Sequence, residues 1–498
     1  MTRVKKPNAN FFRQMLSGHS VMGLTAAFLM YVICVSGTLA VFYKEFWRWE
    51  QPTATAETME VNGQRIEQAL RNAIADLGTD PDADLGEAPA SIGMDMPTSD
   101  WPRMSISYGE HRRYVAADGS LLGDVERPWT SFLARLHFAL NLPLELGVVI
   151  VGIFGVLLMA LIVSGFLAHP GILRDAFSLR LARSRQLQQT DLHNRLSVWA
   201  APFHLIIAIT GAILGLAGAI SLATALLTSP DAGDPVPADQ GSGTQVATAT
   251  AALPDFDTIW RSFSTRSPND QVFYLTVYQP ASSQQRVELN AIRPDRLFWS
   301  QSHHYAANGE YQGPGGGDAA SIGGQMQASL YRLHFGHFGG MPVKIMFLLL
   351  GTALCVVTVT GVNIWLSKRR QRKLPTDTID RLWQVSVWGT LLLLSLSAVL
   401  QLALGIPPIP VFWFGMLVLV AIAWRRGTPT LWAWRLRQLG GLVTALVPLV
   451  HTLRYGQAAW QGGSLSINLV WLALAASLLI LQTTTARSAA KQTQPAGS

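Results

Sequence analysis

The stretch LGVVIVGIFGVLLMALIVSGFLA, residues 146–168, contains no charged residue and decides the class of fold. A helix needs about 20 predominantly apolar residues to cross a hydrocarbon core roughly 30 Å thick. The whole chain of 498 residues is 49% hydrophobic and only 14% charged, whereas soluble domains are about one quarter charged. We therefore expect an integral membrane protein rather than a set of soluble domains.

Further apolar runs bring the predicted number of transmembrane helices to eight. They cover residues 20–43, 199–227, 343–366, 385–404, 411–424, 439–453 and 465–481. The first run is too long for the apolar part of a signal peptide, so we expect it to be retained rather than cleaved. Lysine and arginine gather before the first span and in every second loop, which predicts that both termini face the cytoplasm. The two long polar loops then face outward.

This reading gives an all-α membrane protein with two small α+β outer domains. The predicted segments are 1–43 (cytoplasmic N-terminus and first span), 44–130 (first outer domain), 131–168 (second span), 169–198 (cytoplasmic loop), 199–227 (third span), 228–330 (linker and second outer domain), 331–367 (fourth span), 368–384 (basic cytoplasmic loop), 385–482 (spans five to eight) and 483–498 (cytoplasmic tail).

The outer loops show two similar patterns of helix followed by strands. In the first loop we expect a helix at 63–77 and strands at 103–108 and 112–117. In the second loop, residues 229–252 have the composition of a flexible linker. A helix at 256–263 and strands at 272–278, 286–290 and 297–300 follow, and the glycine-rich 313–318 is expected to be a turn or loop because no Lys-Ser/Thr pair of a phosphate loop follows it.

Cysteine usage and charge exclude several classes of function. Cys34 and Cys355 are the only cysteines and both lie in apolar runs, where a thiol usually behaves as a small hydrophobic group. This excludes a disulfide scaffold, a cysteine-ligated iron–sulfur cluster and covalent haem attachment. The net charge of +7 arises largely beside apolar runs, so we expect the lipid bilayer, and no nucleic acid, as a partner.

Histidines mark an internal duplication of the first four spans. His19 precedes a Ser-Gly pair at 36–37 by 17 residues, and His193 precedes a Thr-Gly pair at 210–211 by 17 residues. Two halves with an even number of spans each are parallel repeats, related by a two-fold axis along the membrane normal. The repeat therefore predicts that His19 faces His193 near the cytoplasmic side.

A second pair of histidines follows the same repeat. Arg-Leu-His-Phe occurs at 135–138 and again at 332–335, and its histidines, His137 and His334, precede the Ser-Gly or Thr-Gly pair of the next span by 27 and 26 residues. The repeat places His137 opposite His334 near the outer side. A single histidine at a membrane boundary is more often structural, but four at equivalent positions favour a functional role.

The two histidine pairs, at two depths, have the chemistry of haem ligands. A neutral imidazole is a good axial ligand for haem iron, and a pair that faces across a helical bundle supplies both axial positions. The spans lack the carboxylates of a di-iron or zinc site. We therefore favour non-covalent haem over a bare metal ion, with His19, His193, His137 and His334 as axial ligands of the iron.

Other residues compete for roles at these sites. His204 lies 11 residues after His193, which would place both on one face of one helix about 16 Å apart, so the choice between them stays open. His337 is an alternative to His334. Nearby arginines are candidates for pairing with haem propionates or for anchoring at the interface: Arg135, Arg195 and Arg332. The remaining histidines are expected to be structural (His169, His451) or solvated (His111, His303, His304).

The chain resembles the PepSY-associated transmembrane proteins, which include inner-membrane siderophore-iron reductases of Gram-negative bacteria. The resemblance covers about residues 10–370, leaves spans five to eight unexplained, and is carried by four groups of residues. These are His19 with Gly23-Leu24, Asp191-Leu192-His193 leading to Pro202-Phe203-His204 and Thr210-Gly211, Leu333-His334-Phe335-Gly336 leading to Thr360-Gly361, and the PepSY-like ending Tyr114-Val115-Ala116-Ala117-Asp118-Gly119 with Leu122-Gly123.

The resemblance implies a four-helix core that carries two b-type haems and moves electrons to a ferric siderophore or other iron chelate in the periplasm. Since only 17 residues follow Leu481, we expect a separate electron donor, which is a flavin reductase, a reduced flavin or a quinol. Two alternatives remain: a PepSY-type binding or regulatory membrane protein without redox activity, and a transporter.

Overall fold

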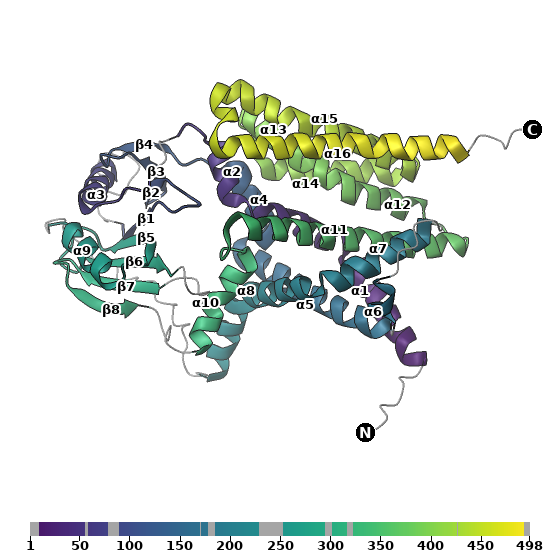
Figure 1. Ribbon diagram of the computed structural model, residues 1–498, viewed down its shortest axis with the longest axis horizontal. Helices are drawn as coiled ribbons and strands as arrows, with labels where there is room; N and C mark the ends of the chain where they lie inside the picture. The colour runs from purple at the N-terminus through teal and green to yellow at the C-terminus, as the bar shows by residue number, and fades with distance from the viewer. Residues whose placement is uncertain are drawn as a thin grey trace, which may run out of the picture. The chain divides into compact units, whose positions relative to one another are not determined.

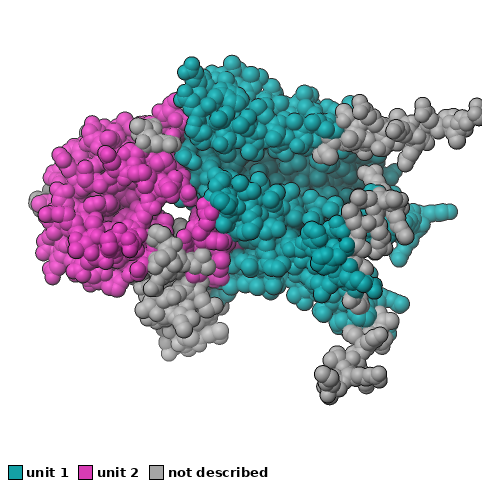
Figure 2. Space-filling view, viewed as in Figure 1, with its two compact units in different colours: residues 1–50, 127–220, 341–498 teal, residues 51–126, 221–340 magenta. Residues whose placement is uncertain are grey.

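The computed structural model describes residues 9–54, 58–77, 89–169, 171–177, 185–228, 252–293, 301–315, 322–425 and 427–492. The chain divides into two compact units (Figure 2). The helical unit comprises residues 1–50, 127–220 and 341–498, and the sheet unit comprises 51–126 and 221–340.

The helical unit is built almost entirely from long helices (Figure 1). Its elements are α1 (Ala9–Ala40), α2 (Tyr43–Glu50), α4 (Pro128–Ala139), α5 (Leu144–Ala168), α6 (Ile172–Asp175), α7 (Arg185–Trp199), α8 (Ala201–Thr228), α11 (Gly340–Gln371), α12 (Asp377–Gln384), the π-helical turn η1 (Val385–Gly389), α13 (Thr390–Leu404), α14 (Pro408–Arg425), α15 (Pro429–Tyr455), the 3₁₀ turn η2 (Gly456–Trp460) and α16 (Gly462–Gln492). The last residues of α8 and the first of α11 belong to the sheet unit.

Eight helices within the described ranges are long and apolar enough to cross a membrane, which confirms the predicted number of spans. They cover Asn10–Ala40, Leu144–Ala168, Ala201–Ile220, Gly340–Gln371, Asp377–Leu404, Pro408–Arg425, Pro429–Trp460 and Gly462–Ile480. The seventh starts about ten residues before its apolar run because Pro429 occupies the first helical turn and the Thr428 side chain accepts the Leu431 N–H.

The first Arg-Leu-His-Phe motif lies on a separate helix, α4, and not on the span that follows it. Leu140 and Asn141 both adopt the left-handed conformation after α4, which ends the helix. Pro143 then precedes α5. Because proline disfavours a helical conformation in the residue before it, the chain cannot run on as one helix.

The sheet unit contains one eight-stranded antiparallel sheet formed by both outer loops. Its elements are α3 (Gly63–Leu77), β1 (Ser91–Asp95), β2 (Met104–Tyr108), β3 (His111–Val115), β4 (Leu121–Asp124), α9 (Phe256–Arg266), β5 (Gln271–Tyr278), β6 (Arg286–Ile292), β7 (Gln301–Ala306), β8 (Tyr311–Gly315) and α10 (Ile322–Phe335). The strand order is β4-β3-β2-β1-β5-β6-β7-β8, so each loop supplies four consecutive strands and the two sets meet where β1 pairs with β5.

Both α3 and α9 pack on the same face of this sheet (Figure 1). Their apolar residues Ile66, Leu70 and Ile259 share one buried core with Leu275 of β5 and Leu289 of β6. Because successive residues of a strand point to opposite faces, the alternate positions lie on the face away from these helices.

The predicted outer elements agree with the structure in part. The helix at 63–77 is confirmed to the residue, and the helix at 256–263 and the strands at 103–108, 112–117, 272–278 and 286–290 correspond to α9, β2, β3, β5 and β6. Strands β1, β4, β7 and β8 were not predicted. The expected turn at 313–318 is wrong for its first three residues, which belong to β8. The expected strand at 297–300 and nearly all of the linker at 229–252 lie outside the described residues.

Candidate functional site

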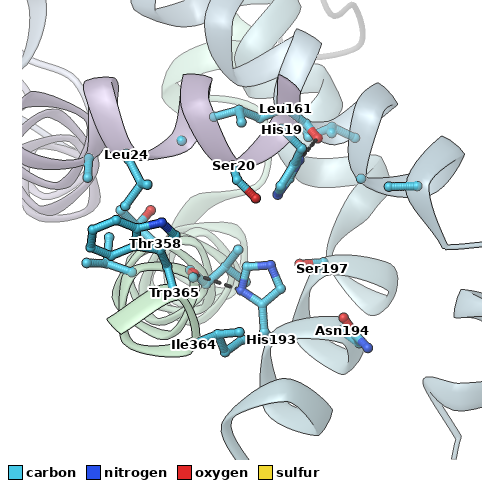
Figure 3. A pocket seen from close by; sticks show the side chains of 18 of the residues that line it. His19, Ser20, Leu24, Leu161, His193, Asn194, Ser197, Thr358, Ile364 and Trp365 are labelled. Atoms are coloured by element: carbon cyan, nitrogen blue, oxygen red, sulfur yellow. Dashed lines mark hydrogen bonds between the residues drawn. The ribbon is translucent and has the colours of Figure 1, made fainter. Parts of the chain in front are cut away.

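A cavity of about 360 Å³ lies among the helices of the first four spans (Figure 3). Residues of α1, α5, α7, α8 and α11 line it, and most of these residues are apolar. His19 of α1 and His193 of α7 extend into it from opposite sides, with their rings directed toward one another. The structure thus brings together the first of the two predicted histidine pairs.

Both rings are held through the same nitrogen. The Nδ1 atom of His19 lies 3.1 Å from the Leu161 carbonyl oxygen and 3.1 Å from the Ser164 hydroxyl. The Nδ1 atom of His193 lies 3.0 Å from the Val357 carbonyl oxygen, with the Thr360 hydroxyl at 3.1 Å. A carbonyl oxygen only accepts, so Nδ1 carries the proton of the neutral ring. This leaves the lone pair on Nε2 of each ring available as a ligand.

The Ser-Gly and Thr-Gly pairs explain why the rings fit at these positions. A Cβ atom on Gly165 would lie 3.4 Å from Cε1 of His19, and one on Gly361 would lie 3.3 Å from Cε1 of His193. Each histidine ring therefore packs closely against a glycine, while the neighbouring hydroxyl adds a contact to Nδ1. The Ser-Gly and Thr-Gly pairs can be read from the sequence. Their contacts with the histidine rings can be seen only in the structure.

His137 is held in the same way at the other end of α1. Its Nδ1 atom lies 2.9 Å from the Ile33 carbonyl oxygen, and a Cβ atom on Gly37 would lie 2.5 Å from Cε1 of its ring. Ile33 precedes Gly37 by four residues, as Leu161 precedes Gly165 and Val357 precedes Gly361. Three of the four repeat histidines thus share one mode of attachment.

A buried glutamate fixes the start of α4, the helix that carries His137. Glu50 accepts the Trp129 N–H at 2.9 Å and the Thr130 N–H at 2.8 Å, and it also accepts the Thr130 hydroxyl. These are N–H groups that the first turn of a helix leaves without partners. Burial raises the pKa of Glu50 to about 7, although the bonds to Thr130 and Trp129 oppose that rise.

A buried ion pair joins the neighbouring helix α2 to α11. Lys344 donates to Glu45 at 2.6 Å, and the two side chains are 3% and 9% exposed. Charges buried this deeply persist only when they are paired. The pair therefore fixes α2 against α11.

The structure distinguishes His193 from His204. Both line the cavity, but the expectation that they share one helix is wrong, because α7 ends at Trp199 and α8 begins at Ala201. His204 contacts the Leu350 carbonyl oxygen through Nε2, the atom that stays available in His19 and His193. Burial, with a smaller contribution from His19, lowers the pKa of His193 to about 4, so its ring is neutral at pH 7.

The three candidate arginines do not line the described cavity. Arg135 donates to the Leu142 carbonyl oxygen at 3.2 Å and so closes the loop after α4. Arg195 lies over the Trp199 ring, 5.4 Å from its centroid. These contacts correspond to the anchoring alternative. The sequence did not single out Lys368, a cation that does line the cavity.

The second Arg-Leu-His-Phe motif lies on α10 of the sheet unit. Arg332 donates to the His337 carbonyl oxygen at 2.9 Å, and His337 N–H donates to the Arg332 carbonyl oxygen. His334 precedes the end of this helix by one residue. In the same unit His303 is only 3% exposed and faces the core, so the expectation that it is solvated is wrong.

These features define a multi-pass membrane protein with a repeated set of histidines, one in its first span and the others on helices that precede the next three spans. The family model for the PepSY-associated TM region matches residues 16–368, and the chain belongs to this family. It is similar to the uncharacterized protein PA4219 of Pseudomonas aeruginosa, with 26% identity over 316 residues that cover 59% of this chain and 77% of that protein. Spans five to eight lie beyond the family match.

Proposed function

We propose that this protein is a dihaem b-type oxidoreductase of the bacterial inner membrane, which passes electrons to a ferric siderophore or similar iron chelate in the periplasm. The observation that carries the proposal is the facing pair His19 and His193, each held through Nδ1 with Nε2 directed into a largely apolar cavity. When bound, haem iron would supply reversible one-electron chemistry between its ferric and ferrous forms.

The residues of the cavity fit such a group. A histidine ligand normally donates its second ring N–H to a carbonyl or carboxylate, which fixes the tautomer and the ring orientation, and Leu161 and Val357 provide these carbonyl oxygens. Low pKa and burial keep the His193 ring in its neutral, ligating form. Most of the lining residues are apolar, and the hydrophobic shell around a metal site influences its redox potential.

The proposed second haem rests on the repeat. His137 has the same attachment to carbonyl and glycine as the first pair. We assign His334 as its partner only because of the sequence duplication.

The direction of electron flow rests on the distribution of lysine and arginine, which predicts that both termini face the cytoplasm. A flavin reductase, a reduced flavin or a quinol would then supply the electrons. Reduction serves as a release step, because ferrous iron binds hard oxygen chelators more weakly than ferric iron does.

The test is an absorption spectrum of the purified protein, oxidised and dithionite-reduced, with haem counted per chain. We expect six-coordinate b-type spectra and two haems in the parent protein, about one in His193→Ala and two in His204→Ala. If His204→Ala alone loses haem, the ligand is His204. A colourless parent protein, expressed with ample haem, would refute the redox function and favour a binding or regulatory role.

A further inference from the structure

The face of the sheet opposite α3 and α9 carries a cluster of side chains with metal-binding groups. Val287 and Leu289 of β6 belong to the core beneath the helices, so their neighbours Glu288 and Asn290 point to the opposite face. On β7 the same alternation places His304 beside Glu288, since the two residues pair directly across the strands.

Three donor atoms from three adjacent strands meet at this point. The Tyr278 hydroxyl of β5 donates to Glu288 Oε2 at 2.8 Å. The Nε2 atom of His304 lies 3.8 Å from the same oxygen, which is too far for a hydrogen bond. The side chains of His304 and Glu288 are 38% and 18% exposed, so a small solute can reach the cluster from solvent.

Neighbouring side chains fix the orientation of the carboxylate and the phenol. Ser302 donates to Asn290 Oδ1 at 2.8 Å, and the Asn290 amide donates to Glu288 Oε1 at 3.1 Å. These two hydrogen bonds leave the Oε2 atom of Glu288 directed toward Tyr278 and His304. The Arg286 guanidinium lies 4.5 Å from the centre of the Tyr278 ring and packs on its face. Such outer contacts are those that orient ligands around metal ions.

We propose that Tyr278, Glu288 and His304 form a binding site for one ferric ion. Metal–ligand bonds of about 2.0–2.2 Å at right angles place neighbouring donor atoms about 3 Å apart. The observed separations of 2.8 and 3.8 Å bracket that value, and rotation of the exposed His304 closes the difference of less than about 1 Å.

The donor set selects ferric iron by its chemistry. A phenolate and a carboxylate are hard anionic oxygens, and an imidazole nitrogen is a common ligand of iron. Two negative charges exceed the single positive charge of Arg286. Since the phenol must lose its proton to bind, uptake of the metal releases one proton. The proposed ferric site does not depend on haem, so it can be tested independently of the proposed function.

Asp95 provides a comparison, because it is a carboxylate on the same face that is held in an ion pair. Asp95 of β1 pairs with Arg112 and accepts from Ser105 at 2.5 Å. Its charge is neutralised by an arginine, and its side-chain partners among the described residues, Arg112 and Ser105, include no imidazole. We therefore expect Asp95 to bind no metal ion.

The test is an iron count on the full-length purified protein. The protein is incubated with ferric nitrilotriacetate and desalted, and total iron is compared with iron in haem. We expect one extra iron per chain with tyrosinate bands in the resonance Raman spectrum. Tyr278→Phe should lose the Raman bands, and Glu288→Gln should lose the extra iron. Asn290→Ala should weaken binding about 10- to 100-fold, as the loss of an orienting partner does.

Two matched variants control for adsorption and misfolding. Asp95→Asn removes a carboxylate from the same face, and Thr276→Ala changes the residue directly opposite Glu288, so both should keep the extra iron. Circular dichroism verifies that each variant is folded. The proposal is overturned if the parent protein takes up no extra iron, or if Glu288→Gln takes up as much as the parent.

Discussion

Replacement of Gly37 by alanine should remove one haem and leave the other. A Cβ atom at this position would lie 2.5 Å from Cε1 and 2.6 Å from Nδ1 of His137, whereas carbon atoms in ordinary contact are about 3.5–4.0 Å apart. The ring must therefore move by about 1 Å. Because Nδ1 is 2.9 Å from the Ile33 carbonyl oxygen, a shift of that size breaks this hydrogen bond as well.

The control variants come from the same motif. Alanine at Gly165 or Gly361 places Cβ 3.4 or 3.3 Å from a histidine ring, so only a few tenths of an ångström must be absorbed and both haems should remain. Alanine is a better helix former than glycine by about 1 kcal/mol, so helix propensity cannot explain a loss. Haem per chain and the reduced spectrum report the outcome. Two intact six-coordinate haems in Gly37→Ala would refute the assignment of His137.

Two further predictions concern buried charges in the helical unit. Lys344→Met leaves the buried carboxylate of Glu45 without its ion-pair partner, and within the described residues its Oε2 atom already has no hydrogen bond. The substitution should lower the free energy of unfolding by about 3–5 kcal/mol. Thermal unfolding in detergent measures this loss of stability. The double variant with Glu45→Gln should lose less stability than Lys344→Met alone. An equal loss in the two variants would contradict the pairing. For Glu50, the folded pKa of about 7 exceeds the ordinary 4.5, so stability should fall by about 3 kcal/mol as the pH rises from 4.5 to 7. A melting temperature as high at pH 8 as at pH 5 would disprove this, and Glu50→Gln should flatten the profile.

The spans and the histidine repeat follow from sequence because both are local signals. Twenty apolar residues have few options other than a membrane helix, and the spacing of His19 from 36–37 is readable without a structure. The pairing of His19 with His193 follows from the symmetry of the repeat. These predictions need no knowledge of how side chains pack.

The hydrogen-bond partners of the histidine rings could not be predicted from the sequence, because every residue has a backbone carbonyl. Nothing in the identity of Leu161 or Val357 marks its carbonyl oxygen as an acceptor for a ring. The joining of the two outer loops was missed for a related reason. The pairing of β1 with β5 brings Ser91 next to Tyr278, and such distant pairings depend on register rather than on local pattern.

The last four spans include two helices, α15 and α16, that form hydrogen bonds with α2. Trp49 donates to Asn468 of α16 at 2.9 Å, and its carbonyl oxygen lies 2.7 Å from Nε2 of His451 of α15. All three side chains are completely buried, and the Asn468 amide lies 3.1 Å from His451 Nδ1, so their polar groups are satisfied where water cannot reach them.

The residue after Trp49 is Glu50, which caps α4 and thereby positions the helix of His137. Buried hydrogen bonds thus tie the C-terminal spans to residues 49 and 50, and Glu50 in turn holds the start of the helix that carries His137. Spans outside the family match thus support the helix that carries His137.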